Sequence, residues 1–442
     1  MKTVLAHMQQ VKPVYWAFAA SIIIAFFFPR SAAYISLLIL VVVSIETRSF
    51  HLKQSVKGFL LQVSPLIFFS LVTAGLSAAS IFWSVDKELS EERSLKLLGI
   101  ISGHLIVFYM LYLRLFQFNN PLEHGAASHP ENTEPFKGTG LITAVISVLL
   151  VTFSMDYMLN TPVAEYLLKL SGKDDRIFES KALFLSELNS NMIVLFLLFL
   201  PCLIWLSVRK NFIWLGITAA ALLACALHTN SESFIIGLII TSLTMAGYLI
   251  LGRAVIFLSA AALMIFLLSF PWVIQFVFEN RFGVLEHHED QFSPIKRLII
   301  WNSTAELALE KPLFGHGINT FRDQTIPFNF RGHDTKQYLH PHNGFAQIWY
   351  EFGIFGALLF SAAIGHFYYR ISKTELRYTR LLYISVANAF ASLVIVYYGL
   401  WQSWWIGMMF IVTFLTLIFG NALNQQKKLH NYVEDEEVTD IS

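Results

Sequence analysis

The amino-acid composition places most of this chain in a lipid environment. It has 442 residues, of which 55% are hydrophobic and 14% are charged, whereas soluble chains carry about 25% charged residues. A soluble fold could not bury so much apolar surface, so the bilayer has to act as the solvent for most of the chain. The charges nearly balance, with 31 Lys and Arg against 30 Asp and Glu, which argues against nucleic acid as a partner.

Apolar segments predict an all-α polytopic membrane protein. A spanning helix needs about 20 mostly apolar residues, and about twelve segments approach this length. The runs are unbroken rather than alternating, which argues against a membrane β-barrel. The second run follows the first at once, which predicts a helical hairpin rather than a cleaved signal peptide. The predicted spans lie near 14–28, 32–45, 59–83, 95–116, 141–160, 189–207, 212–227, 234–251, 254–278, 345–369, 381–399 and 401–420.

Positive charge sets the predicted orientation in the membrane. If both termini are cytoplasmic, the short inside segments hold about twice as many Lys and Arg as the short outside segments, as the positive-inside rule requires. Nine transmembrane helices are then expected in residues 1–278, a long outer loop in 279–344, and three more helices in 345–423. Residues 424–442 contain an acidic run and are expected to form a disordered cytoplasmic tail.

Polar residues gather in the long outer loop. Ser293 followed by Pro294 is typical of a helix start, with Ser as the cap and Pro at the first helical position. A helix is therefore expected from Ile295 to about Glu310, and Pro312 ends it. Beyond a Gly-His-Gly turn the loop concentrates its basic residues, which are Arg322, Arg331, His333, Lys336, His340 and His342.

The stretch from His340 to Asn343 suggests a base beside an anion site. Pro341 suits the first position of a helix, which would put His342 in the first turn, among free backbone N–H groups. Such a helix end binds phosphate and disfavours a protonated imidazole. The alternative interpretation is a histidine that caps an interfacial helix. A metal would need His340, His342 and a third ligand such as His333, and ligands two residues apart at a helix start diverge, so no metal site is expected.

Arginines in the same region are candidates for binding a diphosphate. Arg297 lies on the loop helix and shares a face with Trp301, Arg281 lies where the chain leaves the membrane, and Arg322 follows the turn. A guanidinium fork is well suited to a diphosphate. The alternative is contact with lipid headgroups. The apolar neighbourhood of Arg297 favours the diphosphate for that residue.

Aromatic residues fall near the membrane boundary, and two carboxylates, Glu187 and Glu351, fall near membrane depth. The Trp and Tyr stretches around Trp349, Trp401 and Trp405 are typical of interfacial belts, with sugar stacking as the alternative for Trp349. Glu351 would lie about two and a half turns after His342 in the same helix. A carboxylate inside a membrane is by default a functional hypothesis.

Three stretches in this order resemble the O-antigen ligase / Wzy-type polymerase superfamily of bacterial envelope glycosyltransferases. The stretches are Trp83–Asp86 followed by Arg93–Leu98, Arg297–Trp301 followed by Pro312–Gly317 and Phe321, and His342–Gln347 followed by Glu351–Gly356. The resemblance covers most of the chain from about residue 60 to 370.

The resemblance implies a multi-pass enzyme of the bacterial inner membrane with its active site on the periplasmic face. Such enzymes transfer a glycan from undecaprenyl diphosphate either to the lipid A-core, as ligases, or to another lipid-linked repeat, as polymerases. It implies that His342 activates the acceptor hydroxyl and that Arg297 holds the diphosphate. Arg281, Arg322 and His340 are further candidates for binding the diphosphate, and neither a metal nor another cofactor is implied.

One departure from the family pattern concerns the loop between the seventh and eighth predicted spans. Members often show Ser-Arg there, whereas this chain reads Asn230–Ser233 and has Glu232 in place of the second arginine. Either this chain lacks a second arginine for the diphosphate, or Arg281 or Arg322 replaces it. A small-solute transporter is the alternative from another class, but a carrier favours charged or broken spans at midmembrane in two related halves. Ligase and polymerase remain open.

Overall fold

The computed structural model describes most of the chain. The described residues are 64–116, 134–158, 181–228, 231–285, 293–327, 335–397 and 399–439, with residues 15, 16, 19, 20, 22–24, 165, 166 and 169 in addition. The predicted spans near 14–28 and 32–45 therefore fall largely or wholly outside the described residues.

The described part of the chain is helical, with one short hairpin. Seven of its helices are long and apolar enough to cross a membrane, and α5 and α11 are shorter apolar helices. The chain is thus a multi-pass helical membrane protein, as its composition predicts. The helices are α5 (Ser64–Ser80), α6 (Lys87–Phe116), α7 (Glu134–Met158), α10 (Lys181–Val208), α11 (Phe212–His228), α12 (Glu232–Leu251), α13 (Ala254–Leu285), α14 (Ser293–Glu310), η5 (Thr320–Asp323), α15 (Gly344–Ser372), α16 (Arg377–Val396) and α17 (Ser403–Thr439).

The ends of several elements differ from those expected. α13 continues to Leu285, so the segment predicted as a loop from 279 begins inside a helix. α17 continues to Thr439 through the acidic run, where disorder is expected from residue 424. Gln, Lys, Leu and Glu in this stretch are good helix formers, which accounts for the extension. The antiparallel strands β1 (Thr325–Pro327) and β2 (Thr335–Gln337) are too short to leave a periodic pattern in the sequence.

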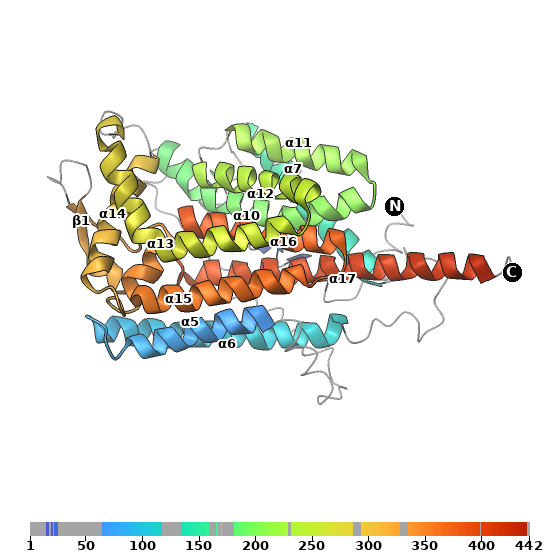
Figure 1. Cartoon of the computed structure of the whole chain (residues 1–442). Helices are drawn as coiled ribbons and strands as arrows, with labels where there is room; N and C mark the ends of the chain where they lie inside the picture. Colours follow the sequence, from blue (N-terminus) through green and yellow to red (C-terminus); the bar gives the residue numbers. More distant parts are fainter. Residues whose placement is uncertain are drawn as a thin grey trace.

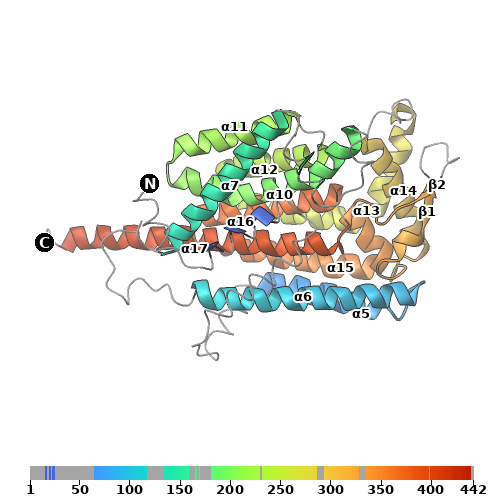
Figure 2. The same cartoon turned by 180° about the vertical axis from the view of Figure 1, so that it is seen from behind.

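The loop elements gather at one end of the bundle. The long helices run side by side, α14 crosses their direction, and β1 and β2 lie at the same end as α14 (Figures 1 and 2). The C-terminal end of α17 lies at the opposite end (Figure 1). α13 packs against both α14 and α15, and α12 packs against α16. α14 spans Ser293–Glu310, which confirms the helix expected from the Ser-Pro start.

A break in α15 is completed by the turn after α14. Gly353 has a φ of 60°, so α15 is kinked there and its backbone groups on either side lack their usual helical partners. The turn Pro312–Gly317 supplies the missing partners. The hydrogen bonds run from Ile354 N to Pro312 O at 2.8 Å, from His316 N to Tyr350 O at 2.8 Å and from Gly317 N to Glu351 O at 3.0 Å.

Glycines allow this close approach. A Cβ at Gly315, whose φ is +70°, would lie 2.5 Å from the carbonyl oxygen of Tyr350, and one at Gly353 would lie 2.6 Å from the carbonyl carbon of Leu313. A Cβ at Gly317 would similarly meet the Oγ of Ser84 at 2.4 Å. The three sequence stretches that carry the family resemblance therefore converge at the α14 end of the bundle.

Candidate active site

The helix that follows the His-Pro-His stretch begins later than expected. Asn343 is its N-cap, and Oδ1 of Asn343 accepts hydrogen bonds from Phe345 N at 2.8 Å and Ala346 N at 3.0 Å. The prediction that the helix starts at Pro341, with His342 in its first turn, is therefore wrong. Asn is among the strongest N-cap residues, and its side chain occupies two of the N–H groups that the prediction reserved for phosphate.

His342 lies just outside the helix in a defined orientation. Its φ is 53°, in the left-handed region, which costs a non-glycine residue roughly 1–2 kcal/mol. Its Nδ1 lies 3.2 Å from the backbone oxygen of Tyr397. A carbonyl oxygen only accepts hydrogen bonds, so Nδ1 carries the proton and Nε2 is the basic atom of the neutral ring.

His340 lies directly beside His342. The two ring centroids are 4.4 Å apart, and the backbone N of His342 donates to Nδ1 of His340 at 3.2 Å. Nε2 of His340 lies 2.8 Å from Nε2 of Gln402, and a Cβ at Gly399 would come within 2.7 Å of its Cγ. Burial lowers the pKa of His340 to about 3, with His342 adding to the shift. His340 therefore stays neutral near pH 7 and would meet a diphosphate as a hydrogen-bonding group, not as a cation.

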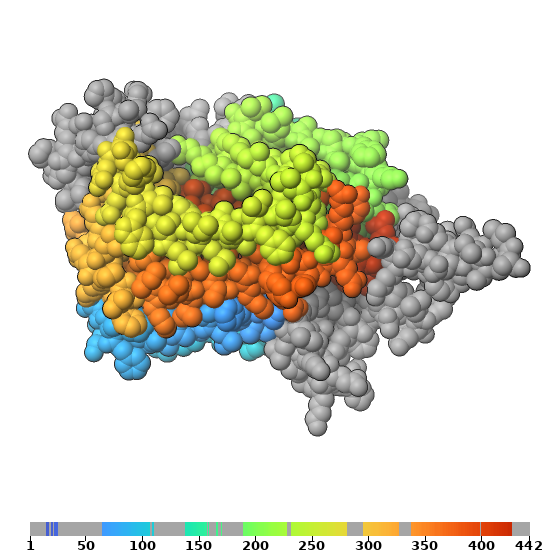
Figure 3. Space-filling view, viewed as in Figure 1, coloured from blue at the N-terminus to red at the C-terminus, as the bar shows by residue number. Residues whose placement is uncertain are grey.

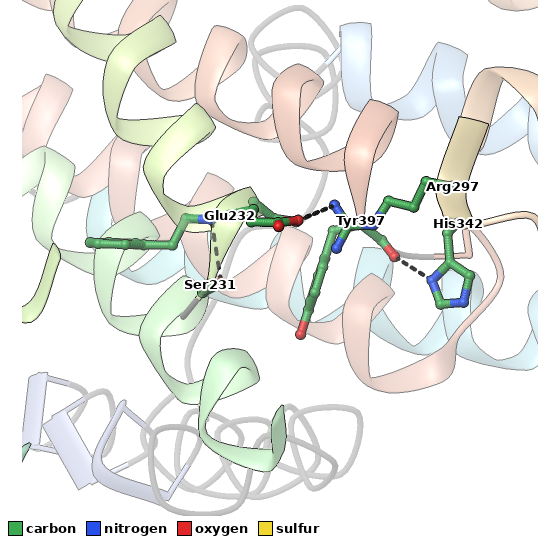
Figure 4. Close-up of polar contacts among 7 residues, drawn as sticks. Ser231, Glu232, Arg297, His342 and Tyr397 are labelled. Carbon is green, nitrogen blue, oxygen red and sulfur yellow. Dashed lines mark hydrogen bonds and ion pairs between the residues drawn. The ribbon is translucent and has the colours of Figure 1, made fainter. Parts of the chain in front are cut away.

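Arg297 extends from α14 to the N-terminus of α12. Its Nη1 donates to Oγ of Ser233 at 3.3 Å and lies 3.8 Å from Oε2 of Glu232 (Figure 4). Burial lowers the pKa of Arg297, while the nearby Glu232 and Tyr397 act in the opposite direction. Ser231 caps α12 by accepting from Phe234 N at 3.4 Å. The carboxylate that stands where the family pattern has an arginine is thus the ion-pair partner of Arg297.

Tyr397 joins Arg297 and His342. Its backbone carbonyl accepts from His342, and Tyr397 is close enough to Arg297 to raise the pKa of that guanidinium. Figure 4 shows the guanidinium of Arg297 and the imidazole of His342 both next to Tyr397. In Figure 3 the surface is hollowed beside α13, and red atoms from the C-terminal part of the chain form the visible floor. The guanidinium of Arg297 and the imidazole of His342 therefore have Tyr397 as a common neighbour.

The other predicted site residues are less closely connected to His342. Arg281 belongs to α13, but its side chain lies outside the described part. Arg322 is exposed on η5, where Glu92 and Arg93 of α6 are charged neighbours. Arg331 and His333 fall outside the described residues.

The tryptophans expected in interfacial belts are buried instead. Trp349 is 1% exposed and donates from Nε1 to the carbonyl of Leu267 at 2.6 Å. That burial excludes sugar stacking on Trp349 in this structure. Trp401 and Trp405 are also buried, so the belt prediction is wrong for all three residues. A run of aromatic residues looks alike in sequence whether it faces lipid or another helix, so only the packing separates the two.

Three contacts at the candidate site have no clear signal in the sequence. Tyr397 contributes its backbone oxygen, which any residue could supply, and Gln402 and Gln347 are single amides in apolar surroundings. Their partners lie 55, 62 and 53 positions away in the chain. Only the packing of α15 against α16, and of α16 against α17, brings them together.

Comparison with known proteins points to one family. Residues 217–361 match a family described as "O-Antigen ligase". The chain is 30% identical over 123 residues to the Rickettsia conorii protein named "Putative polysaccharide ligase RC0486", which covers 26% of this chain and 29% of that protein. It is 31% identical over 121 residues to a protein of the same description from Rickettsia typhi, again covering 26% and 29%.

The chain thus aligns with less than a third of the length of these curated relatives. No solved structure matches it. The matched region includes Glu232, Arg297 and His342, and it ends within α15. Over residues 217–361 the chain carries the O-antigen ligase domain and is a distant relative of proteins described as polysaccharide ligases.

Proposed function

We propose that this protein is a membrane glycosyltransferase that moves a glycan from undecaprenyl diphosphate to an acceptor hydroxyl, with the lipid A-core as the acceptor. The observation that carries the proposal is that Arg297 and His342 are both neighbours of Tyr397. A guanidinium suits the diphosphate of the donor, and an imidazole with basic Nε2 suits the hydroxyl of the acceptor.

The reaction divides between these two side chains. Nε2 of His342 takes the proton of the acceptor hydroxyl. At the same time the oxygen of this hydroxyl forms a bond to the anomeric carbon of the donor glycan. The bond from that carbon to the diphosphate oxygen breaks, and its electron pair stays on the undecaprenyl diphosphate. Arg297 stabilises the charge that develops there. His342 then releases its proton to water, so the ring is ready for another cycle.

The acceptor is tested with the purified protein. Incubation with a lipid-linked glycan and either lipid A-core or a second lipid-linked repeat is expected to give product with lipid A-core. Product formed only with the lipid-linked repeat would instead identify a polymerase. Absence of transfer to both acceptors, with the protein monodisperse in detergent, would contradict a glycosyltransferase function.

The proposed active site should face the periplasm. The charge asymmetry places the loop containing α14 outside, and the structure puts α14 and the C-terminal end of α17 at opposite ends of the bundle. Alkaline phosphatase is active only after export. A fusion at Asn329 is expected to be active and a fusion after Thr439 inactive. The reverse pattern of activities, with both fusions present at equal levels, would contradict the proposed orientation.

A further inference from the structure

The connection between α16 and α17 is tied to the first turns of α15 by a side chain. This connection, described at Tyr397 and residues 399–402, contributes the backbone N of Leu400, which donates to Oε1 of Gln347 at 2.9 Å. The other end of the same amide donates from Nε2 to Oε1 of Glu351 at 2.8 Å. Gln347 therefore links the connection to a carboxyl group one turn further along α15.

Glu351 also holds the connection directly. It is 0% exposed, and its Oε2 accepts from the indole Nε1 of Trp401. Both carboxyl oxygens are thus occupied by donors. Nη1 of Arg93, from α6, donates to the backbone oxygen of Trp401 at 3.1 Å. Because a buried carboxyl group without partners is costly, these bonds fix the position of Trp401 relative to α15.

The same connection determines how the histidines lie. The carbonyl of Tyr397 accepts from Nδ1 of His342, Gln402 contacts Nε2 of His340, and Gly399 packs against the ring of His340. A shift of the connection relative to α15 would therefore move the acceptor that sets the tautomer and orientation of His342.

We propose that Glu351 is a positioning residue for His342, acting through Gln347 and Trp401 on the connection between α16 and α17. The proposal rests on the transfer reaction proposed above. Since Glu351 has no exposed surface, it acts through these contacts and does not touch the substrate. The sequence marks this intramembrane carboxylate as functional, and the proposed function of Glu351 is to position His342.

Replacement of Glu351 by Gln is expected to break one bond of the network. The amide of Gln347 can still donate to the remaining oxygen at position 351, but the new NH₂ group faces the N–H of Trp401, and two donors oppose each other. Loss of a group that orients a functional histidine costs roughly 10- to 100-fold. We expect kcat to fall by that factor, with the KM for the donor changing less than about twofold.

Exchanging the two side chains should restore the network. In the double variant Gln347→Glu/Glu351→Gln, the carboxylate at position 347 accepts from Leu400 N and from the amide at position 351. The oxygen of that amide accepts from Trp401, so all three bonds are present again. The double variant is expected to regain most of the kcat, whereas Gln347→Glu alone places two carboxyl groups together and should be impaired.

A matched control removes a different buried hydrogen bond from the same helix. Tyr368 lies in α15, away from His342, and donates to Oδ1 of Asn388 in α16 at 2.6 Å. Tyr368→Phe is expected to keep normal kcat and KM. Trp401→Phe removes the donor to Glu351, together with part of the buried ring that packs on Phe352 and Phe360. It is a second test if Glu351→Gln does not fold, and it too should lower kcat with little effect on KM.

Labelling of His342 provides a readout that needs no glycan. Diethyl pyrocarbonate modifies neutral imidazole, and mass spectrometry of the full-length protein after digestion gives the rate at His342. We expect faster labelling in Glu351→Gln, because the ring is no longer held, and the wild-type rate in the double variant. If wild-type protein transfers no glycan, the proposed function fails, while the labelling still tests the positioning role.

Two results would overturn the positioning role. One is wild-type kcat and wild-type labelling in both Glu351→Gln and Trp401→Phe. The other is a folded double variant that stays as impaired as Glu351→Gln, since this would mean that a carboxylate is needed at position 351 itself. Recovery of kcat together with the labelling rate in the double variant supports it.

Discussion

His342→Ala is expected to lose nearly all glycan transfer while the protein remains folded. The donor already carries a good leaving group, so the acceptor hydroxyl is the poorer reactant and the base is the group it needs. A positioned base contributes about 10²–10⁴-fold in rate. The orientation of the ring by the carbonyl of Tyr397 supports this role for Nε2. Transfer by purified protein, normalised to the amount of protein, measures the loss.

The backbone at this position calls for a second variant. His342 has a φ of 53°, and Asn tolerates that region better than Ala does. His342→Asn should therefore fold normally and still lack a base, so it is expected to be as inactive as the Ala variant. His340→Ala, which removes a neutral neighbour, should retain more activity. Near-normal transfer by His342→Asn would contradict the mechanism, and so would abolition of wild-type transfer by EDTA with recovery on adding a divalent ion.

The sequence predicts most of the helices because their signals are local. Each apolar run has its own length and hydrophobicity, and the ten predicted spans from 59–83 onward each coincide with a described helix. The Ser-Pro start of α14 is equally local, since the cap and the first turn lie within a few residues. The ends of the helices are predicted less well, because α13 and α17 both continue beyond the expected residues.

The site itself is only partly predictable, because its contacts are between distant segments. The sequence singles out Arg297 and His342. However, Pro341 and Asn343 are two alternative helix starts, and only the structure shows that Asn343 is the N-cap of α15. The sequence also marks Glu232 as a departure from the family pattern without showing its partner. That partner is Arg297, 65 residues away in the chain.

Glu351 shows the same limit, because the sequence marks its position but does not give its role. A carboxylate inside an apolar run signals function, but the sequence alone does not tell whether it meets a substrate, a proton or other side chains. Its burial and its donors show that it meets other groups of the protein. These donors are the side chains of Gln347 and Trp401 and the backbone of Asn319. The kink at Gly353 is hidden for a similar reason, because the turn that completes it lies about 40 residues earlier in the chain.

Arg297→Lys is expected to be strongly impaired although it keeps the positive charge. Lys loses the planar fork that binds two phosphate oxygens, and a hydrogen bond to a charged group contributes about 1.5–3 kcal/mol, which corresponds to roughly 10- to 150-fold in kcat/KM for the donor. The side chain of Arg297 is 18% exposed and is held by Ser233, which fits a defined site better than a contact with lipid headgroups. If headgroups were its only partners, Lys would serve equally.

Two companion variants separate these interpretations. Arg377 is an exposed arginine at the start of α16, remote from Tyr397 at the other end of that helix, and Arg377→Lys should leave transfer unchanged. Glu232→Gln removes the carboxylate that competes with the diphosphate for Arg297, so it is expected to lower the KM for the donor. Full transfer by Arg297→Lys at normal protein level would show that this guanidinium does not bind the donor. A higher KM in Glu232→Gln would show that the carboxylate holds Arg297 in place for the diphosphate, because loss of a competitor can only strengthen binding.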